Sequence, residues 1–223
     1  MVIIGSIIIY QYLREKEKLM FFLNDSLTVV LVGDWNKLYI QPDWMASNVF
    51  EKEEIEIGIN GQGADFSVSY RRDGIIISPG QTNMIFSVIN TDDETLNKLC
   101  KYLNNFVEKA YTPQLFAYGL NADFVESEGI LFAEVLDSMS DTNAIVESGY
   151  EIISTKVSRT LKRNDRIINM DSSLENNNLR VSFNEHHASE ESICDFSIES
   201  IKGFIKECCE ILHGLGYEIE GDE

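Results

Sequence analysis

The side chains with the widest chemical repertoire in this sequence are three histidines and four cysteines. They are His186, His187, His213, Cys100, Cys194, Cys208 and Cys209. Imidazole and thiolate groups bind metal ions and serve as bases or nucleophiles, so their spacing gives the first indication of an active site. None of the cysteines forms a C-x-x-C pair. The pattern favours free, buried, reduced thiols, as in a cytoplasmic protein.

The strongest metal-binding candidate is the stretch that contains the paired histidines. His186 and His187 end a predicted strand, where neighbouring side chains point to opposite faces, so one ion could not easily bind both. Glu185, His187, Cys194 and Asp195 could supply mixed ligands, but their spacing fits no standard zinc pattern. The sequence therefore predicts no metal site and no cofactor.

Nucleophilic catalysis has little support in the residue pattern. There is no G-x-S-x-G motif. Cys209 and His213 are four residues apart on a predicted helix and could touch, but no third group orients them and no oxyanion donor is evident. No catalytic residue is assigned, and a non-enzymatic function is favoured over an enzymatic one.

The charge balance points to the kind of partner. The chain has 37 acidic residues against 18 basic ones, which gives a formal net charge of −19. A protein that binds nucleic acid or anionic lipid normally presents a basic surface, so both partners are disfavoured. The acidity is consistent with simple solvation or with a basic protein partner.

The charges are also segregated along the chain. Residues 110–155 contain acids but no lysine or arginine, and Glu126, Glu128, Glu134 and Asp137 are the candidate partner-binding residues of this region. The stretch that follows, residues 156–166, is basic. If it is a strand, its basic side chains point to alternate faces, so they would not form one continuous surface for binding phosphates.

The elements that must position these residues predict an α+β fold. Residues 92–110 and about 197–213 are amphipathic helices; Thr91 and Ser197 are their candidate N-caps. Strands are predicted at residues 27–32, 55–60, 65–71, 74–78, 84–89, 114–126, 150–162, 165–171 and 179–186, and a short helix at 129–138. Asn60-Gly61 and Asp73-Gly74 are hairpin turn signals.

The order of these elements is similar in residues 20–112 and 113–223. Each half can be read as β-α-β-β-β-α, which predicts antiparallel sheets that are each covered by one long amphipathic helix. The two halves could pack as one domain. An internal duplication is therefore a hypothesis.

Both tryptophans lie in the stretch GDWNKLYIQPDW, residues 33–44. Pro42 ends strand pairing and suits the first turn of a helix, so the stretch is interpreted as a strand, a kink and a helix start. Trp35 and Trp44 then pack that helix against a sheet. The alternative is that they are the aromatic residues of a ligand pocket.

The first residues raise a question about the start of translation. Residues 2–13 are apolar but fewer than the roughly 20 residues of a membrane helix, and they lack the features of a secretory signal. Lys16-Glu17 can be encoded by a ribosome-binding sequence, so translation is predicted to begin at Met20 of a bacterial gene. Residues 1–19 are then a leader or a disordered start, and a membrane-surface or anchoring segment is the alternative.

These observations predict a bacterial, cytoplasmic interaction protein with an acidic docking surface for a basic protein, in the manner of an immunity protein or antitoxin. Two alternatives stay open. One is a small-molecule-binding domain with a pocket between sheet and helix near Trp35 and Trp44. The other is an inhibitor that mimics DNA with its carboxylates. The sequence does not indicate the oligomeric state.

Overall fold

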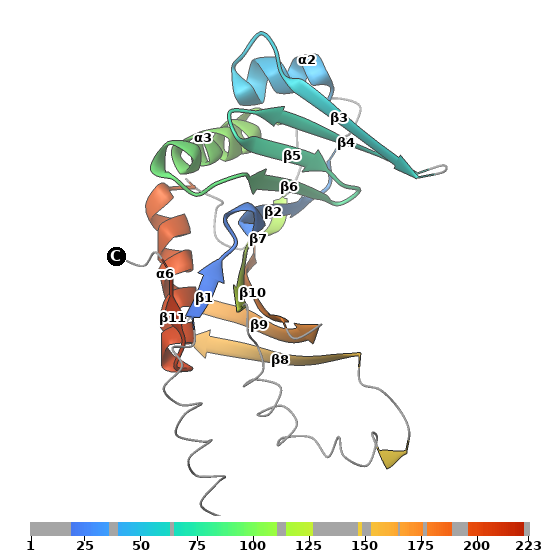
Figure 1. Ribbon diagram of the computed structural model, residues 1–223. Coiled ribbons are helices and arrows are strands. Elements are labelled where there is room, and N and C mark those ends of the chain that lie inside the picture. Colours follow the sequence, from blue (N-terminus) through green and yellow to red (C-terminus); the bar gives the residue numbers. More distant parts are fainter. Residues whose placement is uncertain are drawn as a thin grey trace, which may run out of the picture.

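One large, mostly antiparallel β-sheet forms the centre of the molecule (Figure 1). The computed structural model describes residues 19–35, 40–62, 65–110, 115–126, 147–148, 153–164, 166–175, 178–188 and 196–220. The strands are β1 (Leu19–Phe22), β2 (Thr28–Gly33), β3 (Glu56–Gln62), β4 (Asp65–Arg72), β5 (Ile75–Pro79), β6 (Asn83–Val88), β7 (Leu115–Glu126), β8 (Ser154–Arg163), β9 (Arg166–Glu175), β10 (Asn178–Ala188) and β11 (Glu218–Ile219). Their order is β3-β4-β5-β6-β2-β7-β10-β9-β8, with β1 added beside β7 and β11 beside β1.

The described helices are few. They are the 3₁₀ turn η1 (Asn24–Ser26), the short α2 (Pro42–Trp44), the π-helical η2 (Met45–Phe50), α3 (Asp93–Lys109) and α6 (Ile198–Gly214). The last two lie along the same side of the sheet in Figure 1. None of the described helices has both the length and the apolar character needed to cross a lipid bilayer.

The predicted pair of separately covered sheets is wrong. The described strands form one eleven-stranded sheet, because the first long strands of the two halves, β2 and β7, pair with each other. Thr28 lies opposite Asn121, and Val32 lies opposite Ala117. This pairing joins strands that are about 90 residues apart, and no local pattern in the sequence signals it.

Both long helices pack on one face of this sheet and share one core. The alternating pattern of β10 directs Leu179, Val181 and Phe183 to the helix side, and all three are buried. Phe204 and Leu212 of α6 are buried in the same hydrophobic cluster as the apolar residues of α3. The sheet and its two helices therefore form two layers.

The predicted hairpin turns have different outcomes. Asp73 and Gly74 have φ angles of 51° and 79°, which confirms the tight turn between β4 and β5. Asn60 and Gly61 do not form a turn, because both are strand residues of β3 paired with β4. The strand continues to Gln62.

Local side-chain caps fix where the helices begin. The sequence predicts Thr91 as the first cap, but the structure uses Asp92, whose carboxylate accepts a hydrogen bond from the Thr95 N–H at 2.8 Å. The predicted cap Ser197 is confirmed, since its hydroxyl accepts from the Ser200 N–H at 3.2 Å.

A ladder of amide and hydroxyl side chains crosses the face opposite the helices. Thr28, Asn121, Asn184, Asn169 and Thr160 occupy paired positions on β2, β7, β10, β9 and β8. Each bonds to its neighbour, with distances of 3.0, 2.8, 3.4 and 2.9 Å from β2 to β8. A shift of one residue would break two of these bonds in β7, β10 or β9 and one in β2 or β8, so the ladder helps to fix the register of these strands.

Some predictions concern residues outside those described. These are the short helix at 129–138 and residues 1–18 of the proposed leader. Strand β1 begins at Leu19, and the Met20 side chain is fully buried. The start of translation and the duplication of the halves stay predictions.

Candidate functional site

The predicted acidic docking residues are only partly within the described structure. Glu126 ends β7 opposite Leu179, and its side chain is buried. It therefore offers little surface to a partner. Glu128, Glu134 and Asp137 lie outside the described residues.

The two tryptophans meet at the same phenylalanine of α3. The ring centroids of Trp35 and Phe106 are 5.2 Å apart, and those of Trp44 and Phe106 are 6.2 Å apart in an edge-to-face contact. Pro42 opens α2, in agreement with the predicted helix start. Both indoles pack the segment against the core, although the buried Nε1 of Trp35 has no hydrogen-bond acceptor among the described residues.

The first exposed feature is the terminal strand β3 and the loop before it, called here the β3 edge. β3 pairs only with β4 among the described strands. Ile57 and Ile59 project from the core side of the sheet but are 48% and 68% exposed. Glu53, Glu54 and Glu56 are exposed and have no ion pair within the described residues. The β3 edge thus combines free backbone groups, two apolar side chains and three carboxylates.

The other terminal strand, β8, has the opposite character. It carries Lys156, Arg159, Lys162 and Arg163, all exposed. Charged side chains, lysine above all, discourage the addition of another strand to a sheet edge. The β8 edge is therefore protected in a way that the β3 edge is not.

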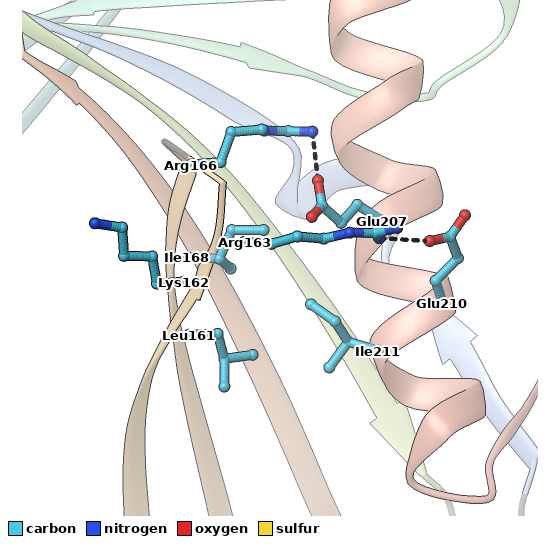
Figure 2. A pocket seen from close by; sticks show the side chains of 8 residues that line it. All are labelled: Leu161, Lys162, Arg163, Arg166, Ile168, Glu207, Glu210 and Ile211. Carbon is cyan, nitrogen blue, oxygen red and sulfur yellow. Dashed lines mark hydrogen bonds and ion pairs between the residues drawn. The ribbon is translucent and has the colours of Figure 1, made fainter.

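The second feature is a groove between α6 and the β8–β9 hairpin, called here the α6 groove. Its inner cavity of about 230 Å³ has Leu161, Ile168 and Ile211 among its lining residues. Figure 2 shows that two charged contacts bridge this gap from the hairpin to the helix: Arg166 reaches Glu207, and Arg163 reaches Glu210. An adjoining cavity of about 330 Å³ is lined by the same four charged residues and also by Asn164, Gly203 and Lys206.

Arg166 is held rigidly by two carboxylates. Its Nε and Nη2 donate to the two oxygens of Glu185 at 2.5 and 2.6 Å, and its Nη1 pairs with Glu207. Burial alone would raise the pKa of Glu185, but the hydrogen bonds from Arg166 and His187 lower it to about 2. Glu185 is therefore ionised although its side chain is only 1% exposed.

An aromatic and imidazole pair extends this network into the sheet. His187 Nε2 lies 3.2 Å from Glu185 Oε1, and its ring stacks on Tyr118 at a centroid distance of 4.3 Å. The structure thus brings together Glu185 and His187 from the proposed mixed metal ligands; Cys194 and Asp195 lie outside the described residues. The Glu185 carboxylate is already engaged by Arg166, which makes it a structural ion pair rather than an open ligand.

The described thiols are placed for packing. Cys100, Cys208 and Cys209 are buried, as predicted, and form no disulfide within the described residues. Burial raises the pKa of the Cys208 thiol, which disfavours the reactive thiolate. No group of three or more histidine, cysteine or acidic side chains within the described part of the chain is arranged to hold a metal ion.

The sequence matches no model of a known protein family and no curated protein. Its functional surfaces must therefore be inferred from chemistry and placement. The Arg166–Glu185–Glu207 network was not predicted, but the sequence contains a signal for it. Glu185 occupies an inward position of β10, and Glu207 adjoins the apolar stripe of α6, so each places a carboxylate where an apolar residue is expected.

Proposed function

We propose that this protein functions by binding another protein, and that the β3 edge receives an extended, basic segment of that partner. The observation that carries this proposal is a terminal strand that pairs on one side only among the described strands, with exposed isoleucines on it and, on it or just before it, carboxylates that make no ion pair to a described residue. An inhibitor that covers a basic protein surface, such as an immunity protein or antitoxin, is one form of this function.

The free backbone of β3 supplies a general source of affinity. A strand at the end of a sheet presents N–H and C=O groups that an incoming strand can bond, which is the mode of recognition called strand addition. β3 has seven residues and contains no lysine or proline that would oppose such pairing. Strand β8, at the other end of the sheet, carries four basic side chains that oppose the addition of another strand.

The two isoleucines supply apolar contact at alternate positions. Ile57 and Ile59 are two residues apart, so they point to the same face, beyond the buried Tyr70 of β4. An added strand would place its own alternate side chains beside them. The partner segment is therefore expected to carry β-branched or other apolar residues at every second position.

The carboxylates determine the preferred charge of the partner. Glu53, Glu54 and Glu56 lie within four residues and are not neutralised by an ion pair within the described structure. By contrast, Glu51 is held between Lys101 and Lys109 at 2.8 Å from each. Lysine or arginine side chains on the partner would form ion pairs with these three carboxylates and would increase the rate of association.

The proposal is tested by affinity capture from native lysate with the full chain, the double variant Ile57→Lys/Ile59→Lys, and the control Ile89→Lys. Ile89 is a similarly exposed isoleucine, at 57%, outside the β3 edge. A stoichiometric basic protein should be retained by the native chain and the control, be lost from the double variant, and dissociate at high salt. Equal retention by the double variant, or equal loss from the control, would contradict the proposal.

A further inference from the structure

The α6 groove lies at the opposite end of the sheet from the β3 edge and has the features of a small-molecule site. Its two cavities share Arg163, Arg166, Glu207 and Glu210, so they adjoin across the same charged side chains. The inner cavity, at about 230 Å³, is smaller than the 300–1,000 Å³ or so of typical ligand pockets. It therefore suits a group about the size of one amino-acid residue.

The inner wall of the groove is aliphatic. Leu161 of β8 and Ile211 of α6 point toward each other across the gap in Figure 2, and Ile168 of β9, drawn above Leu161, also lines the cavity. Leu161, Ile168 and Ile211 are all branched aliphatic residues without a polar side-chain atom. A branched aliphatic group would fill this part of the groove and remove apolar surface from water.

The mouth of the groove offers both signs of charge. Arg166 is already bonded to Glu185 and Glu207. Within the described residues Arg163 makes one ion pair, to Glu210 at 3.2 Å, and both of these side chains are largely exposed. Exposed ion pairs of this kind are weak and exchange easily. Lys206, which lines the outer cavity, has no ion pair within the described residues.

A zwitterion matches this mouth better than an ion of one sign. If a ligand enters between Arg163 and Glu210, its carboxylate can bind Arg163 and Lys206 while its ammonium group binds Glu210. Arg163, Lys206 and Glu210 then each have a partner of opposite sign, so opening the exposed pair leaves none of these three charges uncompensated. A simple anion would leave Glu210 unpaired, and a simple amine would leave Arg163 unpaired.

A glycine leaves room for these groups on the helix. Gly203 is an exposed residue of α6 that lines the outer cavity, and a Cβ built at this position meets no atom within 4 Å. Glycine within a helix is unfavourable relative to alanine, so a larger residue would be expected there on stability grounds alone. With glycine at this position, no side chain projects from residue 203 toward the outer cavity that it lines.

We propose that the α6 groove binds a free branched-chain amino acid. The side chain lies against Leu161, Ile168 and Ile211, the carboxylate lies between Arg163 and Lys206, and the ammonium group faces Glu210. This site goes beyond the proposed protein-binding function and does not depend on it. It also gives the basic residues at the end of β8 a role beyond protecting the sheet edge.

The test is a titration of the full chain with L-leucine, followed by NMR of the backbone and the isoleucine methyl groups. Saturable shifts at Ile168, Ile211 and Gly203 are expected, with a dissociation constant on the order of 1 mM or below. N-acetyl-leucine, leucinamide and glycine each lack one recognised feature and should bind at least about tenfold more weakly. N-acetyl-leucine and leucinamide also represent the last and first residues of a peptide, so preferential binding of either would replace the free amino acid by a chain terminus and overturn the proposal.

Two variants separate the groove from general effects of charge. Gly203→Leu should abolish the leucine shifts without loss of helix, because the added side chain enters the outer cavity. Lys206→Ala should weaken binding about tenfold, whereas Lys202→Ala should not, since Lys202 is on the same helix but pairs with Asp93 of α3. The absence of shifts at 10 mM leucine, or unchanged binding by Gly203→Leu, would overturn the proposal.

Discussion

The two long helices share one hydrophobic core, but the contacts that supplement this core differ between the two flanks of the sheet. On the β3–β6 flank, α3 is locked by rings: Phe106 contacts Trp35, Trp44 and Phe86 at centroid distances of 5.2 to 6.2 Å. On the β8–β10 flank, α6 reaches the outer strands through ion pairs of Arg163 and Arg166, with a cavity beside them. The charged bridges of this second flank leave a cavity of about 230 Å³ between them.

The terminal strands of the two flanks, β3 and β8, also differ in their exposed side chains. The flank with the aromatic cluster ends in β3, which carries exposed isoleucines and lies next to exposed carboxylates, and the flank with the ion pairs ends in the basic β8. The contacts inside a flank therefore do not determine the chemistry of its edge. The aromatic flank presents a terminal strand, and the ion-paired flank presents a groove.

The largest effect is expected where the aromatic lock is broken. Phe106→Ala removes a fully buried ring and its three aromatic neighbours' contacts, so it should lower the free energy of unfolding by about 3–5 kcal/mol. Urea unfolding monitored by tryptophan fluorescence measures this directly. Val107→Ala, one residue along the same helix and only partly buried, is the control. A loss below about 1 kcal/mol for Phe106→Ala would show that the flank is not packed as described.

The next effect tests the ionic flank. Glu185→Gln leaves Arg166 with one carboxylate fewer in a buried site and should cost about 2–4 kcal/mol at pH 7. Because Arg166 is partly exposed and keeps Glu207, the loss should be smaller than for Phe106→Ala. Chemical denaturation of both variants at the same pH gives this ranking, and the reverse order would break the comparison.

The pH dependence of stability has a definite sign at this site. The pKa of Glu185 is lowered from 4.5 to about 2 in the folded state, so its ionised form stabilises the fold fully above about pH 4.5. This contribution, on the order of 3 kcal/mol, should be lost as the pH falls from 4.5 toward 2. Unfolding free energies measured across this range should fall less steeply for Glu185→Gln than for the native chain. Glu210→Gln, which changes an exposed carboxylate, should keep the native slope.

These two flanks also show what the sequence could and could not predict. The helices at 93–109 and 198–214 and most strands follow from local periodicity, because apolar residues recur at three- and four-residue or at two-residue steps. The joining of two halves into one sheet depends on β2–β7 pairing between distant residues, which local patterns do not encode. The predicted hairpin turn at Asn60-Gly61 is wrong because both residues pair with β4 as part of strand β3.

The candidate surfaces were harder to predict than the fold. Single-sequence charge counts drew attention to Glu126, which is buried, because they do not indicate which acids face solvent. The backbone of β3 is exposed to a partner because β3 is the last strand in the order of the described sheet, and this order is known only from the structure. The tryptophans could be assigned to packing because the strand, kink and helix start are all local features.

A smaller effect distinguishes the two bridges of the α6 groove. Arg163→Ala breaks an exposed ion pair with Glu210 and should change the unfolding free energy by less than about 1 kcal/mol. Thermal or urea unfolding at low and moderate salt measures it. A loss as large as that of Glu185→Gln would mean that the mouth of the groove is a structural element and not an exchangeable pair.

The smallest effect on folding is expected at the β3 edge. Ile59 is 68% exposed, so Ile59→Lys should alter the unfolding free energy by no more than about 0.5 kcal/mol. Ile77→Lys provides the contrast, since Ile77 is fully buried on β5 and should not tolerate the charge. Comparable destabilisation by both variants would show that Ile59 is needed for packing and is not a free contact.

The most direct test of strand addition at β3 is amide hydrogen exchange of the full chain, measured alone and with the partner captured from lysate. Exchange should slow in peptides that cover residues 56–62, where the unpaired amides of β3 gain acceptors, and should stay unchanged in those that cover residues 154–163 of β8. Protection confined to β8 or to the helices, with none in β3, would contradict the account.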